Sequence, residues 1–275
     1  MNQQFKGGIF VFFGGASFGI LSTIVKTANR EGYNVGQITG TQTFFGMLLL
    51  WGIYFLQQLF SKKRVNKEAA PATAGWKVAV AGSFTGLASI CYYQSVVLLP
   101  ASIAIILTIQ YLWISMLIEA LVFKIKPGRL QMMAAVIVLL GTVFAGGVFN
   151  DAVVLNARGI IFGLMAAVSY AIFLIASGRI GNEMPVFKKS ALMITGCCVL
   201  TWIIFPPVFL FNGVLAAGLY KWGLLLALAG AIIPPLFFSY GVPKVGVSLG
   251  AILTATELPV AVIASCLVLK ESVDA

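Results

Sequence analysis

The sequence contains no histidine, and only 9% of its 275 residues are charged. Soluble domains carry about 25% charged residues, so this composition excludes an ordinary soluble protein. The only aspartates, Asp151 and Asp274, lie outside the long apolar runs. No nucleophile with a neighbouring base and no set of metal ligands is present. We therefore expect no enzyme activity, no cofactor and no bound metal.

Two other features of soluble or ATP-driven proteins are missing. There is no glycine-rich nucleotide-binding loop, so ATP-driven pumping would need another subunit. The basic residues, which give a net charge of +10, occupy short segments beside apolar runs rather than a polar domain. We therefore do not expect nucleic acid as a partner.

Apolar residues make up 60% of the chain. A helix that crosses a bilayer needs about 17–25 apolar residues, and nine runs are long enough. We predict an all-α integral membrane protein with spans over residues 7–27, 36–60, 77–99, 101–123, 129–149, 157–177, 188–211, 221–240 and 247–269.

The basic residues also predict the orientation. Of the 18 Lys and Arg, 13 fall on the side of the N-terminus, including a cluster in Ser61–Gly75, and 5 fall on the other side. Loops rich in Lys and Arg stay in the cytoplasm. We predict a multi-pass protein of a bacterial inner membrane with a cytoplasmic N-terminus.

Weak internal similarity divides the chain into two units. A shift of 147 residues places Gln110 on Glu257 and Tyr93 on Tyr240. We therefore predict a five-helix repeat over residues 1–150 and a second repeat over residues 151–275. Five spans is an odd number, so the second repeat enters the membrane from the opposite side and the two are inverted. Four spans are visible in the second repeat, which predicts a tenth helix after the ninth.

Glu257 is the most informative residue, because it lies near the middle of the ninth apolar run with no Lys or Arg in that run. An acidic residue at a bilayer centre costs roughly 2.5–3.5 kcal/mol, so it usually faces a cavity and has a function there. It can hold the cationic part of a substrate, or take up and release a proton. The alternative is a structural carboxylate hydrogen-bonded between helices.

Other polar and aromatic residues inside the spans are candidates for the same cavity. Gln110 shares the site if the repeats are symmetric, or else makes an interhelical hydrogen bond. We interpret Tyr92 as an anchor at the membrane interface and Glu119 as a salt-bridged structural carboxylate. The candidates for lining the cavity are Tyr93, Gln94, Tyr240, Ser17, Ser169, Tyr170 and Trp113.

One segment resembles a known transporter family. In Ile252–Glu271, Pro259-Val260 opens a small apolar helix that ends at the acidic Glu271, and Leu98–Leu107 forms a counterpart in the first repeat. This pattern resembles the EamA family of the drug/metabolite transporter superfamily. The resemblance implies a ten-helix secondary transporter, commonly an exporter of amino acids or other small metabolites, with a central cavity lined by both repeats.

These observations predict a secondary-active transporter that works by alternating access. We expect it to export amino acids or other small zwitterionic or cationic metabolites, with the lipid bilayer, the solute and protons as partners. The alternative is a multidrug or organic-cation exporter of the same fold. A membrane scaffold or receptor is a third reading, but it would not need repeats with matched central polar residues.

Overall fold

The computed structural model describes residues 2–60, 73–145 and 156–269. The predicted orientation of the loop within Ser61–Gly75, the loop that follows residue 145, and the tenth helix after Glu271 rest largely on residues outside these ranges.

The described residues form helices and contain no strand, which confirms the all-α prediction. The first half contains α1 (Gln3–Gly19), α2 (Leu21–Arg30), α3 (Val35–Phe60), α4 (Gly75–Leu98), α5 (Ala101–Thr108), α6 (Tyr111–Val122) and α7 (Arg129–Ala145). The second half contains α8 (Ala157–Arg179), α9 (Val186–Ile204), η1 (Val208–Leu210), η2 (Leu215–Leu219), α10 (Tyr220–Leu226), η3 (Ala227–Ile232), α11 (Ile233–Val245), α12 (Val247–Thr254), α13 (Glu257–Ala264) and η4 (Ser265–Leu269).

Seven helical segments within these ranges are long and apolar enough to cross a membrane, and several join two or more short helices. The segments α4 and α7 account for the other two predicted spans. The seventh span is shorter than predicted, because Phe205 has an extended backbone and α9 ends at Ile204. A proline disfavours the helical conformation in the residue before it, so Pro206 determines where α9 ends.

The eighth span is longer than predicted and irregular. It runs from Leu215 to Val245, and Pro234 and Pro235 occupy the first turn of α11. Proline is tolerated there because the first N–H groups of a helix have no partner within it. The helical conformation is instead interrupted earlier in the span, at Gly218 (φ 138°, ψ −16°).

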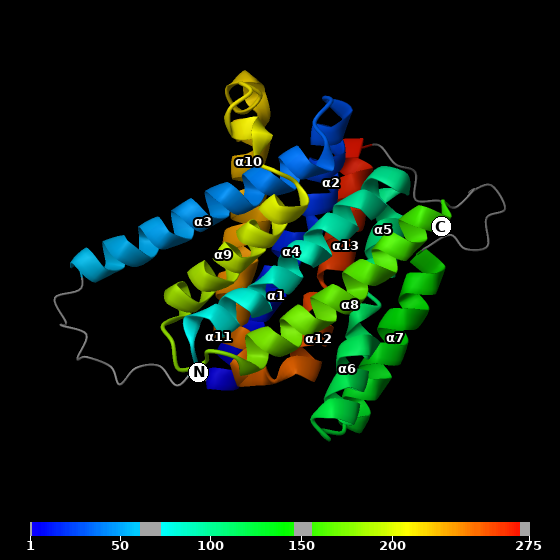
Figure 1. Ribbon diagram of the computed structural model, residues 1–275. Helices are drawn as coiled ribbons and strands as arrows, with labels where there is room; N and C mark the ends of the chain where they lie inside the picture. Colours follow the sequence, from blue (N-terminus) through cyan, green and yellow to red (C-terminus); the bar gives the residue numbers. More distant parts are fainter. Residues whose placement is uncertain (1, 61–72, 146–155, 270–275) are drawn as a thin grey trace.

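The centre of the bundle is built on α4, which packs against both α8 and α9, while α1 packs against α11 (Figure 1). Small residues bring these helices close together. A Cβ atom added to Gly196 of α9 would lie 1.8 Å from the Ala79 carbonyl oxygen of α4. In contrast, the far end of α3 projects from the bundle in Figure 1, and Leu59 and Phe60 are 80% and 82% exposed. Such apolar exposure fits contact with lipid.

Two spans break at equivalent residues. The fourth span is interrupted between Thr108 and Tyr111, and the ninth between Thr254 and Glu257, 146 residues later at both edges. The residue before each second half has the same backbone angles, φ −58° and ψ −16°. The structural register between these spans is thus 146 rather than the predicted 147. Tyr111, and not Gln110, is the counterpart of Glu257.

Candidate functional site

Glu257 is the first residue of α13 and is 4% exposed. The helix break before it ends the regular hydrogen bonding of α12, and Pro259 lies in the first turn of α13, where no N–H donor is needed. The sequence therefore places a carboxyl group at the start of a half-helix, inside the bundle.

Glycines on α1 allow a close approach to this break. A Cβ atom added to Gly19 would lie 2.5 Å from the Glu257 carbonyl oxygen, and one added to Gly15 would lie 2.6 Å from the Thr254 carbonyl oxygen. Real Cβ atoms do not approach so closely, so only glycine fits at either position. The Gly15/Gly19 pair therefore fixes the distance between α1 and the residue that carries the carboxyl group.

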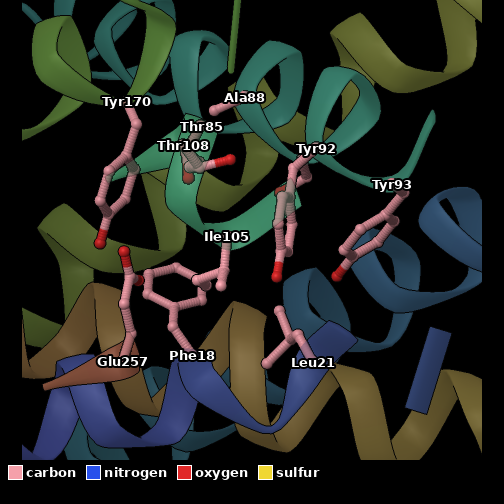
Figure 2. Close-up of a pocket in the computed structure, with 11 residues that line it drawn as sticks. Phe18, Leu21, Thr85, Ala88, Tyr92, Tyr93, Ile105, Thr108, Tyr170 and Glu257 are labelled. Carbon is pink, nitrogen blue, oxygen red and sulfur yellow. The ribbon is translucent and has the colours of Figure 1, made fainter. Parts of the chain in front are cut away.

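Glu257 faces an internal space that we call the central cavity (Figure 2). Side chains from α1, α2, α4, α5, α8 and α13 enclose it. The space open to the centres of water-sized molecules is about 40 Å³, which is room for on the order of three waters. The free space beside Glu257 is therefore small in this conformation. Its lining residues are Phe18, Leu21, Thr85, Ala88, Ser89, Tyr92, Tyr93, Ile105, Thr108, Tyr170 and Glu257.

Three buried oxygen atoms of this lining have no hydrogen-bond partner among the described residues: Oε1 of Glu257 and the hydroxyls of Tyr92 and Tyr170. Figure 2 shows the Glu257 carboxyl and the Tyr170 hydroxyl pointing toward each other, with the Tyr92 hydroxyl on the other side of Ile105. Buried polar atoms are nearly always paired. These three oxygens therefore lack the partners that buried polar atoms usually have.

The charge of the cavity has one sign. Glu257 is its only acidic residue, and no Lys or Arg is among its lining residues. The rest of the wall is largely aromatic, and the rings of Phe18 and Tyr170 meet edge to face at 5.6 Å. A carboxylate among aromatic rings attracts cations, through direct charge pairing and through the faces of the rings.

Tyr111 of α6 is a further neighbour of the Glu257 carboxyl group. Its hydroxyl lies 2.8 Å from Oγ1 of Thr254 and also interacts with the Glu257 carboxyl. Its ring contacts that of Tyr170 edge to face at 4.5 Å. The sequence did not indicate Tyr111, because the register of 147 pairs Glu257 with its neighbour. A register of 146 would have found it.

Three of the predicted site residues line the central cavity: Glu257, Tyr93 and Tyr170. Tyr93 contributes its ring only, because its hydroxyl donates to Oε1 of Gln42 at 2.7 Å. Tyr92 also lines the cavity and is buried, so its interpretation as an interfacial anchor is wrong.

Gln110 and Trp113, which were expected to share the cavity, are not among its lining residues in this structure. The Gln110 side chain donates to the Ile106 carbonyl of the preceding turn at 3.1 Å. It accepts a hydrogen bond from the indole N–H of Trp113, whose side chain is 43% exposed.

The other candidates are also absent from the lining. Tyr240 packs outside it, with the Lys244 ammonium 3.3 Å from its ring centroid. Ser17 donates to the Ala229 carbonyl at 2.7 Å. Gln94 is half-buried and Ser169 is buried, and neither contacts the central cavity.

Glu119 provides a contrast with Glu257. One of its carboxylate oxygens pairs with Arg179 at 2.7 Å, and the other accepts from the Ser248 hydroxyl at 2.7 Å. Both oxygens are thus satisfied, as expected of a structural carboxylate. Its partner is Arg179 of α8 rather than the nearby Lys124.

Comparison with known proteins agrees with this architecture. Residues 5–147 and 157–275 each match the EamA-like transporter family. A solved structure titled only "Crystal structure of protein" is 15% identical in sequence, with a TM-score of 0.68. The match covers 97% of this chain and 88% of that one, and it shows similarity of fold alone. No curated protein matches the chain.

Proposed function

Because the chain belongs to the EamA-like transporter family, we propose that it is a secondary-active transporter of small solutes that carry a cationic group. One observation carries the proposal. A buried carboxyl group at a helix break, with one oxygen unpaired, faces a small aromatic cavity lined by helices of both repeats. A family of transporters and a buried carboxyl group between helices of the two repeats point to alternating access.

The comparison with Glu119 argues against a purely structural role for Glu257. Both residues are buried acids on helices of the same bundle. Glu119 has partners for both oxygens, whereas Oε1 of Glu257 has none. A carboxylate costs roughly 2.5–3.5 kcal/mol at the bilayer centre, and a structural one would not leave an oxygen unpaired.

The same carboxyl group can couple the transport of solute to the transport of protons. A single acid in a cavity without Lys or Arg is neutralised either by a proton or by the cationic part of a solute. Binding of one displaces the other, so the carrier crosses between its two states only in a neutralised form. Such exchange moves solute against protons, and we assign the direction as export on the basis of the family resemblance.

The lining favours an organic cation over an amino acid. An amino acid bound to ionised Glu257 would leave its own carboxylate in a cavity without Lys or Arg. The second candidate, an amino-acid exporter, rests on the hydroxyls of Thr85 and Ser89, which could hydrogen-bond that carboxylate. The two functions differ in one requirement, namely whether the solute has an acidic group.

Transport into proteoliposomes with an imposed pH gradient tests both. Matched pairs of solutes, such as an amino acid and its carboxylate-free amine, isolate the effect of the acidic group. We expect the amine to accumulate faster. Preference for the amino acid would favour the second candidate, and no pH-driven flux of either solute would contradict the proposal.

A further inference from the structure

Tyr92 and Tyr93 are neighbours on α4, but their hydroxyls differ in hydrogen bonding. The Tyr93 hydroxyl donates to Oε1 of Gln42 at 2.7 Å. Tyr92 is only 8% exposed, yet its hydroxyl has no hydrogen-bond partner among the described residues. Ser22 of α2 lies close to Tyr92, but its hydroxyl donates to the Gly19 carbonyl at 3.5 Å. Tyr92 therefore holds a buried polar group that the chain itself leaves unused.

The unpartnered tyrosine hydroxyls coincide with the central cavity. Four tyrosines of the described residues are buried. The hydroxyls of Tyr93 and Tyr111 are hydrogen-bonded to other side chains, at 2.7 and 2.8 Å. Those of Tyr92 and Tyr170 have no partner, and both of these residues line the cavity. Buried hydroxyls are nearly always paired, so the two exceptions are placed where a group from outside the chain can pair with them.

The unpartnered oxygens of the cavity form two groups. Figure 2 shows the Glu257 carboxyl and the Tyr170 hydroxyl together on one side, and the Tyr92 hydroxyl on the other side of Ile105. The ring of Phe18 also lies between the two sides in this view. A group that binds to both sides therefore passes an apolar stretch of the wall. The cavity has an acidic end, an apolar middle and a neutral polar end.

We propose that Tyr92 is a specificity-determining residue that hydrogen-bonds a neutral polar group of the solute, while Glu257 binds its cationic group. This rests on the proposed function, in which Glu257 holds a cation. The solute is then an amine that carries a hydroxyl or carbonyl group beyond an apolar spacer. The three parts of such a molecule match the acidic end, the apolar middle and the neutral polar end of the cavity.

A charged group fits poorly at the Tyr92 end. A tyrosine hydroxyl is uncharged at neutral pH and both donates and accepts hydrogen bonds. The cavity lining contains no Lys or Arg to neutralise an anion, and its one acid, Glu257, lies at the other end. A buried charge without a partner is costly, whereas a neutral hydroxyl or carbonyl pairs with Tyr92 without that cost. The second polar group of the solute is therefore neutral.

The cavity widens before such a solute fits. Its free space in this conformation is about 40 Å³, which is room for water only. Tyr92 belongs to α4 of the first repeat and Glu257 to α13 of the second. In alternating access the two repeats move against each other around the site. Such a movement changes the distance between the two ends of the cavity but keeps their chemistry.

Calorimetric binding of two matched solutes to the full chain in detergent tests the inference. One solute is a linear primary amine, and the other is the amino alcohol of the same length with its hydroxyl at the far end. A series of lengths finds the spacing that fits. We expect the wild type to bind the best-fitting amino alcohol more tightly than the amine. In Tyr92→Phe, the amino alcohol should bind about fivefold more weakly, because one neutral hydrogen bond is lost, while binding of the amine is unchanged.

Two variants at the acidic end provide matched controls. Tyr170→Phe removes the other unpartnered tyrosine hydroxyl of the cavity, which faces the Glu257 carboxyl in Figure 2. It should change the binding of both solutes by the same factor, because both carry the ammonium group. Glu257→Gln removes the charge that holds this group, so both solutes should lose most of their binding. Only Tyr92→Phe should change the preference between the two solutes.

The outcomes separate the role of Tyr92 from the proposed function. If neither solute binds to the wild type, or if both bind equally well to Glu257→Gln, the proposed function fails. If both bind through Glu257 but Tyr92→Phe keeps the wild-type preference, or Tyr170→Phe reduces it as much, only the role of Tyr92 is overturned. Absence of any preference in the wild type overturns it as well, and this measurement needs no variant that must fold.

Discussion

Tyr111 and Glu257 occupy the same position in the two repeats, each as the first residue after a helix break, and their side chains interact with each other. The symmetry that relates the repeats thus brings a neutral donor and an acid together at the centre of the bundle. If the two repeats had the same residue at this position, the pair would be two tyrosines or two acids. The difference between the two residues gives the site one titratable carboxyl group with a hydrogen-bonding neighbour.

The two tyrosines of α4 should respond differently to loss of the hydroxyl. Tyr93→Phe leaves the buried Gln42 side chain without its partner, and we expect it to lower the free energy of unfolding by about 1–3 kcal/mol. Tyr92→Phe removes a hydroxyl that has no hydrogen-bond partner. It should leave stability nearly unchanged but weaken solute binding. Thermal unfolding and solute binding in detergent measure the two effects, and the reverse pattern would remove Tyr92 from the site.

Gly19→Ala should impair both stability and transport. The new methyl group would lie 2.5 Å from the Glu257 carbonyl oxygen and 2.8 Å from Cβ of Val260. Overpacking of this kind typically costs about 1–3 kcal/mol. Gly52→Ala is a matched control on α3, because an added Cβ there meets nothing within 4 Å. Unfolding and transport of the two variants side by side test the prediction. Equal behaviour would show that α1 does not fix the position of Glu257.

Glu119→Gln should affect stability but not coupling. Arg179 loses its charged partner, but it is partly exposed and can hydrate, while Ser248 can still donate to the amide oxygen. We expect a loss of about 1–3 kcal/mol in the free energy of unfolding and an unchanged pH profile of transport. A changed profile would mean that Glu119 takes part in proton exchange.

Much of the fold was predictable, because long apolar runs in a chain with 9% charged residues can only form membrane helices. Glu257 was predictable for the same reason, since a charge is conspicuous in an apolar run. The family resemblance drawn from Pro259-Val260 is confirmed by the match over both halves of the chain.

The detailed site was harder to predict. The similarity of Gln110 to Glu257 fixed a register one residue away from the structural one, and on a helix one residue changes the face by about 100°. No proline near Tyr111 indicates the helix break that precedes it. Tyr92 and Tyr240 are both tyrosines, but Tyr92 lines the cavity and Tyr240 packs under Lys244. Packing between segments that are distant in the sequence determines this difference.

The most direct test of the central claim is the pH dependence of solute flux in proteoliposomes containing the wild type, Glu257→Gln or Glu119→Gln. Glutamine keeps the size and hydrogen bonding of glutamate but neither its charge nor its titration. We expect that Glu257→Gln folds, and that its net flux is lost or no longer varies with pH, while Glu119→Gln keeps the wild-type profile. A Glu257→Gln protein that transports like the wild type across neutral pH would contradict the claim.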